Sequence, residues 1–108
     1  MNILNFIVDF AGVKNKQEVI DRLISVFQLP DAGNWDSFQD WFTSLESDSA
    51  IVNSMNPLPQ KIHLDVKNIA DVKKVSQRDY DILLEILNEG IQSEKPENKI
   101  KFSFKFII

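Results

Sequence analysis

The sequence predicts an α/β fold: a two-layer domain with a three-stranded parallel sheet and helices mainly on one face. Alternating apolar residues mark three strands, at 2–10, 60–66 and 100–108. Amphipathic helical stripes separate these strands, and helical crossovers favour parallel pairing with right-handed connections. The alternation also implies that one face of the sheet is much wetter than the other, so we expect the helices to cover the drier face.

A helix follows the first strand. Gly12 interrupts the strand, and Asn15 suits an N-cap because its side-chain oxygen can accept a hydrogen bond from a free N–H of the first helical turn. Glu18, three residues later, would complete a capping box. Pro30 is expected to end the helix. The apolar stripe of this helix consists of Val19, Ile20, Leu23, Ile24 and Phe27.

A second helix is predicted over 35–45, after the short loop 31–33. Asn34 is a good N-cap for it. The segment 46–59 is rich in Ser, Asn and Pro and is predicted as a loop, with a turn of helix around 50–55. The inner face of the second helix consists of Trp35, Phe38, Phe42 and Leu45, with Trp41 at its edge.

The middle strand is followed by a short irregular or helical piece at 68–75. Ser76 and Asp79 form a second capping-box pattern, which opens a helix that runs to about Ile91. The strand directs Ile62, Leu64 and Val66 inward and Lys61, His63 and Asp65 outward. The apolar stripe of the helix consists of Ile82, Leu83, Ile86 and Leu87.

A polar loop at 92–98 leads to the last strand. Within that strand Ile100, Phe102, Phe104, Phe106 and Ile108 are predicted to point inward, and Lys101, Ser103 and Lys105 outward. The element order is thus strand, helix, helix, strand, helix, strand. A length of 108 residues favours one domain, 1–108.

Composition excludes several classes of protein. Hydrophobic residues make up 44% of the chain, enough for a packed core and too many for general disorder. The absence of Cys excludes disulfides, thiolate metal sites and cysteine nucleophiles, and it fits the cytoplasm, where we expect the protein. Asn5 and Asp9 interrupt the apolar N-terminus, so no signal peptide is expected. No apolar run approaches the roughly 20 residues of a membrane span, and we expect no membrane partner.

All of the net negative charge lies in one segment. The chain has 12 Lys and Arg against 16 Asp and Glu, for a formal charge of -4. No Lys or Arg occurs from Leu23 through Gln60, a segment whose own charge is -5. A basic partner would be attracted to this segment and nucleic acid repelled, so no direct nucleic-acid binding is expected. The acids in it are Asp31, Asp36, Asp40, Glu46 and Asp48.

The residues that enzymes use for chemistry are sparse. His63 is the only histidine, and a solvent-exposed strand residue is a better interpretation of it than a catalytic base. A metal site could be built from Asp36, Asp40 and Glu89, but no calcium-loop spacing is present. The chain has three glycines and no glycine-rich phosphate loop. We therefore expect no catalytic residue, no bound metal and no cofactor.

Asp36 and Asp40 lie four residues apart and so share one face of the second helix. Asp36 is in the first turn, where the helix dipole favours a carboxylate, whereas Asp40 gains less from it. Like charges at this spacing weakly destabilise a helix. Two interpretations stay open from spacing alone: an ordinary solvated helix face, or a surface to which a partner supplies the missing cations.

The segment from Leu29-Pro30 through Asn34-Trp35-Asp36 to Asp40-Trp41-Phe42 resembles the signature of the barstar family of ribonuclease inhibitors. The element order, the acidic central helix and the closing Phe- and Ile-rich strand are similar to that family as well. The resemblance covers nearly the whole chain. It implies a protein that performs no chemistry of its own and fills a ribonuclease active site.

In proteins of this family the loop and the second helix enter the phosphate-binding cleft, where aspartates pair with basic residues of the enzyme. By this resemblance Asp40 matches the central family aspartate, Asp36 a second one, and Asn34 the Asn at the helix start. Glu89 matches a further contacting acid in the last helix. The implied partner-binding residues are Asp31, Gly33, Asn34, Asp36, Gln39, Asp40, Thr43 and Glu89.

Two features depart from the family pattern. The loop Asp31-Ala32-Gly33 is shorter and lacks aromatic residues, and Gln39 stands where better-known members have an aromatic. Aromatic side chains often carry much of the binding energy of an interface. The departures thus keep the charge pattern and alter the contacts that depend on shape.

The predicted function is inhibition of a ribonuclease, as the immunity protein of a nuclease toxin with a basic active site. Carboxylates would then stand in for RNA phosphate by accepting charge-assisted hydrogen bonds. The alternative from another class is a regulatory or scaffolding module of the same fold that binds a basic protein other than a nuclease. A third hypothesis, a metal-dependent hydrolase, would require metal-dependent stabilisation.

Overall fold

A computed structural model describes residues 2–92 and 100–108. One sheet has the strand order β1-β2-β3, and both pairings are parallel. The strands are β1 (Ile3–Asp9), β2 (Lys61–Lys67) and β3 (Lys101–Ile107). The predicted three-stranded parallel sheet is confirmed.

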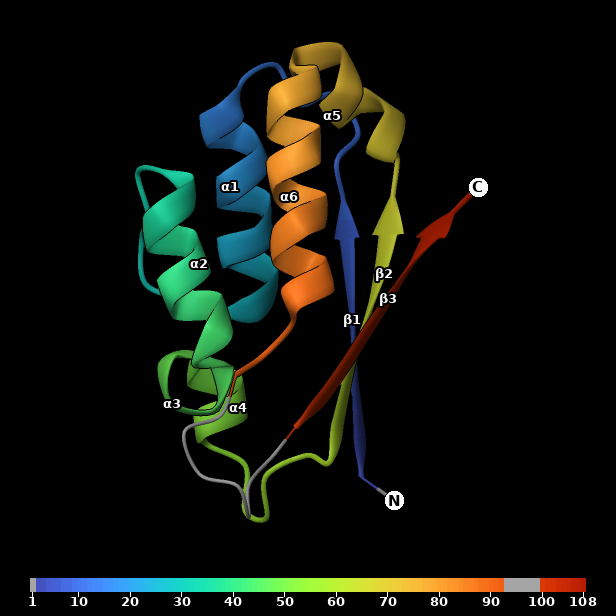
Figure 1. The fold of residues 1–108 in the computed structure, drawn as a ribbon. Coiled ribbons are helices and arrows are strands. Elements are labelled where there is room, and N and C mark those ends of the chain that lie inside the picture. The colour runs from blue at the N-terminus through green and yellow to red at the C-terminus, as the bar shows by residue number, and fades with distance from the viewer. Residues whose placement is uncertain (1, 93–99) are drawn as a thin grey trace.

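The helices lie on one side of this sheet. They are α1 (Lys16–Phe27), α2 (Trp35–Thr43), α3 (Leu45–Asp48), α4 (Ala50–Asn53), α5 (Ile69–Val75) and α6 (Gln77–Glu89). Figure 1 shows α1, α2 and α6 side by side, with α5 beyond the arrowheads of β1 and β2. In the described part of the chain, the opposite face of the sheet carries no helix. The predicted α/β fold with helices mainly on one face is therefore confirmed.

Helix α1 forms for the expected reasons, with two local differences. All five residues of its predicted stripe are buried, and the Asn15 side chain accepts a hydrogen bond from the Glu18 N–H. The Glu18 carboxylate accepts from the Lys14 N–H at 2.6 Å, so the reciprocal bond of the capping box falls one residue early. The helix ends at Phe27, before Pro30, because Gln28 adopts a left-handed conformation with φ 54°.

The segment after α2 is more regular than predicted. The second helix ends at Thr43, and α3 follows it where the end of the second helix and a loop were predicted. The helical turn predicted around 50–55 is confirmed as α4. The Oγ of buried Ser49 donates to the Phe27 carbonyl at 2.6 Å and accepts from the Val52 N–H. This bond fixes the segment to the end of α1, and burial of Leu45 and Val52 then favours helical turns over an open loop.

The last helix also differs from prediction at both ends. Ser76 caps it through the Asp79 N–H, but the Asp79 carboxylate accepts from the Trp35 indole at 2.9 Å and does not return to Ser76. The helix ends at Glu89 because Gly90 has a positive φ of 71°. Of its predicted stripe, Ile82 is only half-buried.

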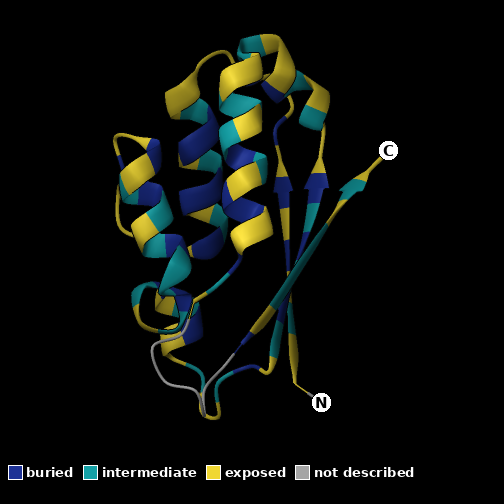
Figure 2. Cartoon of the chain, in the orientation of Figure 1, coloured by how far each residue is buried: buried dark blue, intermediate teal, exposed yellow. Residues whose placement is uncertain are grey.

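Strand β3 is an edge strand, and its side chains are less buried than predicted (Figure 2). Phe102, Phe104 and Phe106 point inward but stay half-buried. Ile108, predicted to point inward, is exposed because it lies beyond the last paired residue, Ile107. Apart from Gln92, the predicted polar loop at 92–98 lies outside the described residues.

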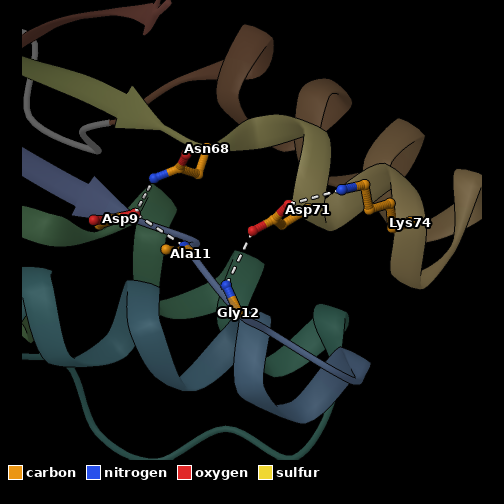
Figure 3. A network of polar contacts seen from close by, with 6 residues as sticks. All are labelled: Asp9, Ala11, Gly12, Asn68, Asp71 and Lys74. Carbon is orange, nitrogen blue, oxygen red and sulfur yellow. Dashed lines mark hydrogen bonds and ion pairs between the residues drawn. The ribbon is translucent and has the colours of Figure 1, made fainter.

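Polar contacts join the carboxyl ends of β1 and β2 (Figure 3). The Asp9 carboxylate accepts from the Asn68 side chain at 2.7 Å and from the Ala11 N–H at 2.9 Å. Asp71 accepts from the Gly12 N–H at 3.0 Å. In many α/β proteins this edge of the sheet binds ligands, but here its polar groups hold the β1 and β2 connections together.

Replacing Asp9 with asparagine is expected to lower the free energy of unfolding at neutral pH. The stability of the variant should then fall less steeply with acid than that of the wild type. The Asn68 hydrogen bond, followed by that from Ala11, holds the pKa of the Asp9 carboxyl below its usual value of 3.8. This stabilisation is present above the unfolded-state pKa and is lost as pH falls through the lower folded-state pKa. Urea unfolding of wild type and Asp9→Asn from pH 7 to pH 2 measures this contribution. The difference in free energy of unfolding between the two proteins should disappear in acid. Asp31→Asn, in an exposed loop, is the control and should show no such convergence.

Candidate partner-binding surface

Packing of its inner face determines which side of α2 meets solvent. Phe38 and Phe42 are fully buried with ring centroids 5.7 Å apart. Trp35 is 7% exposed, and its indole N–H donates to Asp79 on α6. These contacts hold α2 against the core and α6, so the opposite side of the helix is directed outward. Trp41 is half-buried, as expected for the edge of the inner face.

The start of α2 is held by its N-cap. The Asn34 side-chain oxygen accepts from the Ser37 N–H at 2.8 Å, as predicted. Asn34 is exposed, but its side-chain oxygen is already occupied by the hydrogen bond from the Ser37 N–H. Its role in the structure is thus to orient the first turn, in which Asp36 lies.

Asn34→Ala is expected to lower the free energy of unfolding by about 1 kcal/mol, because the first turn loses its side-chain acceptor. Asn34→Gly should cost only a few tenths of a kcal/mol, since glycine is also tolerated at an N-cap. Chemical denaturation of the two variants and wild type provides the measurement. Equal losses for Ala and Gly would show that the amide contributes nothing as a cap.

Asp36 and Asp40 are both exposed on α2. Within residues 2–92 and 100–108, neither carboxylate forms an ion pair, and α2 contains no basic residue. The helix dipole favours Asp36 in the first turn but offers Asp40 little. The negative face of α2 is therefore uncompensated inside the described structure.

A hydrogen bond connects this helix to the end of α6. The Gln39 side-chain amide donates to the Glu89 carboxylate at 2.7 Å; Gln39 is half-buried and Glu89 is exposed. Glu89 occupies the last turn of α6, where the helix dipole disfavours a negative charge. Tertiary structure thus places a third carboxylate beside α2 and orients it.

The other predicted site residues lie at the two ends of α2. Asp31 and Gly33 line an open hollow of about 620 Å³ between the loop and α1, together with Asp21. Thr43 is half-buried; its hydroxyl donates to the Asp40 carbonyl, and its own carbonyl accepts from the Gln92 N–H. Thr43 therefore contributes to helix geometry more than to the exposed surface.

Two other chemical hypotheses receive no support from the geometry. In the described ranges no three His, Asp or Glu side chains gather as metal ligands, so Asp36, Asp40 and Glu89 do not form such a group. His63 lies on the uncovered face of the sheet, where its ring contacts Ser103 and Asp65 at 2.7 and 2.8 Å. Its side chain is 22% exposed, so it is more enclosed than predicted.

Sequence analysis missed two residues that position the site. Asp79 anchors Trp35, and the Gln92 N–H holds the end of α2. The Ser76-x-x-Asp79 pattern marked Asp79 only as a capping residue. Nothing in the sequence pattern identifies Gln92.

The fold and this surface define a small α/β protein that displays an acidic helix, without a gathered metal site in its described residues. Residues 3–106 match the family described as Barstar (barnase inhibitor), and the chain belongs to the barstar family. The resemblance inferred from the sequence is thereby confirmed. A search of curated proteins finds no significant match. No helix in the described ranges has the length and apolar character needed to cross a membrane.

Proposed function

We propose that this protein inhibits a ribonuclease by placing the acidic face of α2 in the enzyme's phosphate-binding cleft. The observation that carries the proposal is the pair Asp36 and Asp40, exposed and without ion-pair partners in the described structure. A cleft that binds RNA is a focused positive potential. Carboxylates held on a rigid helix can replace phosphate there by accepting charge-assisted hydrogen bonds.

Glu89 extends this surface beyond the helix. Its carboxylate is oriented by Gln39, so the enzyme would meet three negative groups from two packed helices. Asp31 and Gly33 would contribute from the adjoining loop, and Asn34 and Thr43 would act by holding the ends of α2. The protein itself would supply no catalytic group, metal or cofactor.

We further propose that the target is a nuclease toxin and that the protein acts in the cytoplasm as a single-domain immunity protein. The altered contacts support a target other than a secreted ribonuclease of the barnase type. Gln39 is engaged with Glu89, and the loop before α2 carries no aromatic residue. The proposed binding surface therefore has fewer aromatic side chains to anchor a partner than the family pattern, while it keeps the family's charge pattern.

Titration into RNA-cleavage assays tests the proposal. The purified chain is added to barnase and, separately, to any nuclease encoded beside its gene. Stoichiometric loss of cleavage of at least one enzyme is expected. If a basic protein without nuclease activity is bound through α2 and neither nuclease is inhibited, the scaffolding alternative holds instead.

Salt should act mainly on association. Opposite fields accelerate encounter and are screened over about 8 Å at physiological ionic strength. Raising NaCl from low to near-molar concentration should therefore slow association more than it speeds dissociation. Stopped-flow or surface-based kinetics would measure both rates, and a salt-independent association rate would contradict electrostatic steering.

A further inference from the structure

The uncovered face of the sheet, on the side away from the helices, has a composition of its own. We define this outer sheet face by the side chains that alternate with the buried ones in the three strands. In register across the sheet its rows are Ile3–Lys61–Lys101, Asn5–His63–Ser103, Ile7–Asp65–Lys105 and Asp9–Lys67–Ile107. No helix of the described chain covers them.

The outer sheet face is positive on a negative protein. It carries four lysines against two aspartates, whereas the whole chain has a charge of -4. Lys61 and Lys101 are direct neighbours in the parallel register. Adjacent like charges on one face of a sheet are unfavourable, so this arrangement does not serve sheet stability.

Both aspartates of the face are already engaged by groups other than lysine. Asp65 contacts the His63 ring at 2.8 Å, and that ring is braced on its other side by Ser103 at 2.7 Å. Asp9 accepts from Asn68 and from the Ala11 N–H. Among residues 2–92 and 100–108, the lysines of this face form no ion pair. Within the described residues, Lys67 acts on Asp9 only through longer-range attraction, and the charges of Lys61, Lys101 and Lys105 have no ion-pair partner.

The same face also carries exposed isoleucines, two on edge strand β1 and one on edge strand β3. Ile3, Ile7 and Ile107 are 45%, 60% and 38% exposed. Together with the terminal Ile108, they are the exposed large hydrophobic residues of the described chain. Single exposed apolar residues are ordinary, but three on one face, among lysines that form no ion pair within the described residues, are typical of an interaction surface.

We infer that the outer sheet face docks an acidic amphipathic helix of a partner protein. Such a helix would set carboxylates against the lysines and apolar side chains against the isoleucines. RNA fits less well, since the face offers no aromatic side chain other than His63 for base stacking. A symmetric second copy would oppose lysine to lysine.

This inference goes beyond ribonuclease inhibition and does not depend on it. The face lies across the molecule from α2 (Figure 1), so both surfaces are free to be occupied together. The protein would thus hold a basic partner with its helices and an acidic partner with its sheet.

An NMR titration of the full chain with synthetic peptides tests the inference. The probe is a Glu- and Leu-containing amphipathic peptide of about 18 residues, or five helical turns. Its controls carry Lys for Glu or Ser for Leu, and a uridine oligonucleotide is a fourth probe. Saturable shifts at Ile7 and Lys105 are expected with the first probe, whose affinity should be at least tenfold above that of each of the other three.

Charge-reversal variants distinguish peptide binding at the outer sheet face from general attraction to the charge of the chain. Lys61→Glu with Lys101→Glu should weaken peptide binding roughly tenfold, whereas Lys14→Glu with Lys16→Glu, the same charge change near α1, should alter it less than about twofold. Ile7→Ser is a milder variant whose folding is checked by circular dichroism, and it should also weaken binding. If the wild-type protein inhibits a ribonuclease, all three variants should inhibit it equally well, because the altered residues lie outside α2.

Three results would overturn the inference. The first is indifference of peptide binding to the Lys61 and Lys101 reversal. The second is binding of the uridine oligonucleotide to this face with no binding of the acidic peptide. The third is a concentration-dependent self-association of the free protein whose shifts map to the same face.

Discussion

Asp40→Ala is expected to weaken binding to the target ribonuclease by about 2–5 kcal/mol, the range for removing one partner of a desolvated charge pair. Measurements on ribonuclease–inhibitor complexes are among those that define this range. Asp40 is exposed, and its carboxylate has no ion-pair partner in the described structure, so folding stability should change little. Inhibition titrations measure the first effect and urea unfolding the second.

Asp48→Ala is the matched control, because it removes the same charge from the same Lys- and Arg-free segment but from α3. It should change affinity by less than about 1 kcal/mol through long-range attraction alone. Equal losses for Asp40→Ala and Asp48→Ala would mean that net charge, and not a phosphate-like contact on α2, governs binding.

Phe42→Ala is expected to cost about 3–5 kcal/mol of folding stability, since it opens a cavity in the core. The Phe42 ring is fully buried and contacts Phe27 on α1, Phe38 on α2 and Phe102 on β3, with centroids 5.5, 5.7 and 5.0 Å away. It therefore joins three elements through one side chain. Small domains have only about 5–15 kcal/mol of stability in total, so the loss is a large part of it.

Phe106→Ala is the comparison for this prediction, because Phe106 is a half-buried phenylalanine on the edge strand. This variant should lose clearly less stability, because folding buries less of the apolar surface of the Phe106 side chain than of Phe42. Thermal and urea unfolding of both variants give the values. A Phe42→Ala loss no greater than that of Phe106→Ala would show that the contacts of α2 with the core are not the main support of this helix.

The centre of the candidate surface was predictable because it depends on local geometry. Residues four apart lie on one face of a helix, so Asp36 and Asp40 could be paired once a helix was predicted there. The Asn34 cap is equally local and is confirmed. The outward direction of the acids also followed, since Trp35, Phe38 and Phe42 occupy the other side of the helix and are buried.

The edges of the surface were not predictable in the same way. The Gln39–Glu89 bond joins residues 50 positions apart, and the Trp35–Asp79 bond joins residues 44 apart. Glu89 was proposed for the site only through family resemblance, and nothing in the sequence linked it to Gln39. Asp79 was expected to serve its own helix cap, but packing of α6 against α2 offers it the Trp35 indole instead.

By itself the sequence determined the strands, the main helices, the N-cap residues of α1, α2 and α6, and the acidic face of α2, because hydrophobic period and N-capping act within a few residues. Only the tertiary structure decided how α6 completes that surface, why 45–48 folds into a short helix, and which charged groups of the described sheet pair with one another. The Ser49–Phe27 and His63–Asp65 contacts show the reason. The sequence around a polar side chain is compatible with several hydrogen-bond partners. The partner that it finds is decided by how the helices and strands pack against one another.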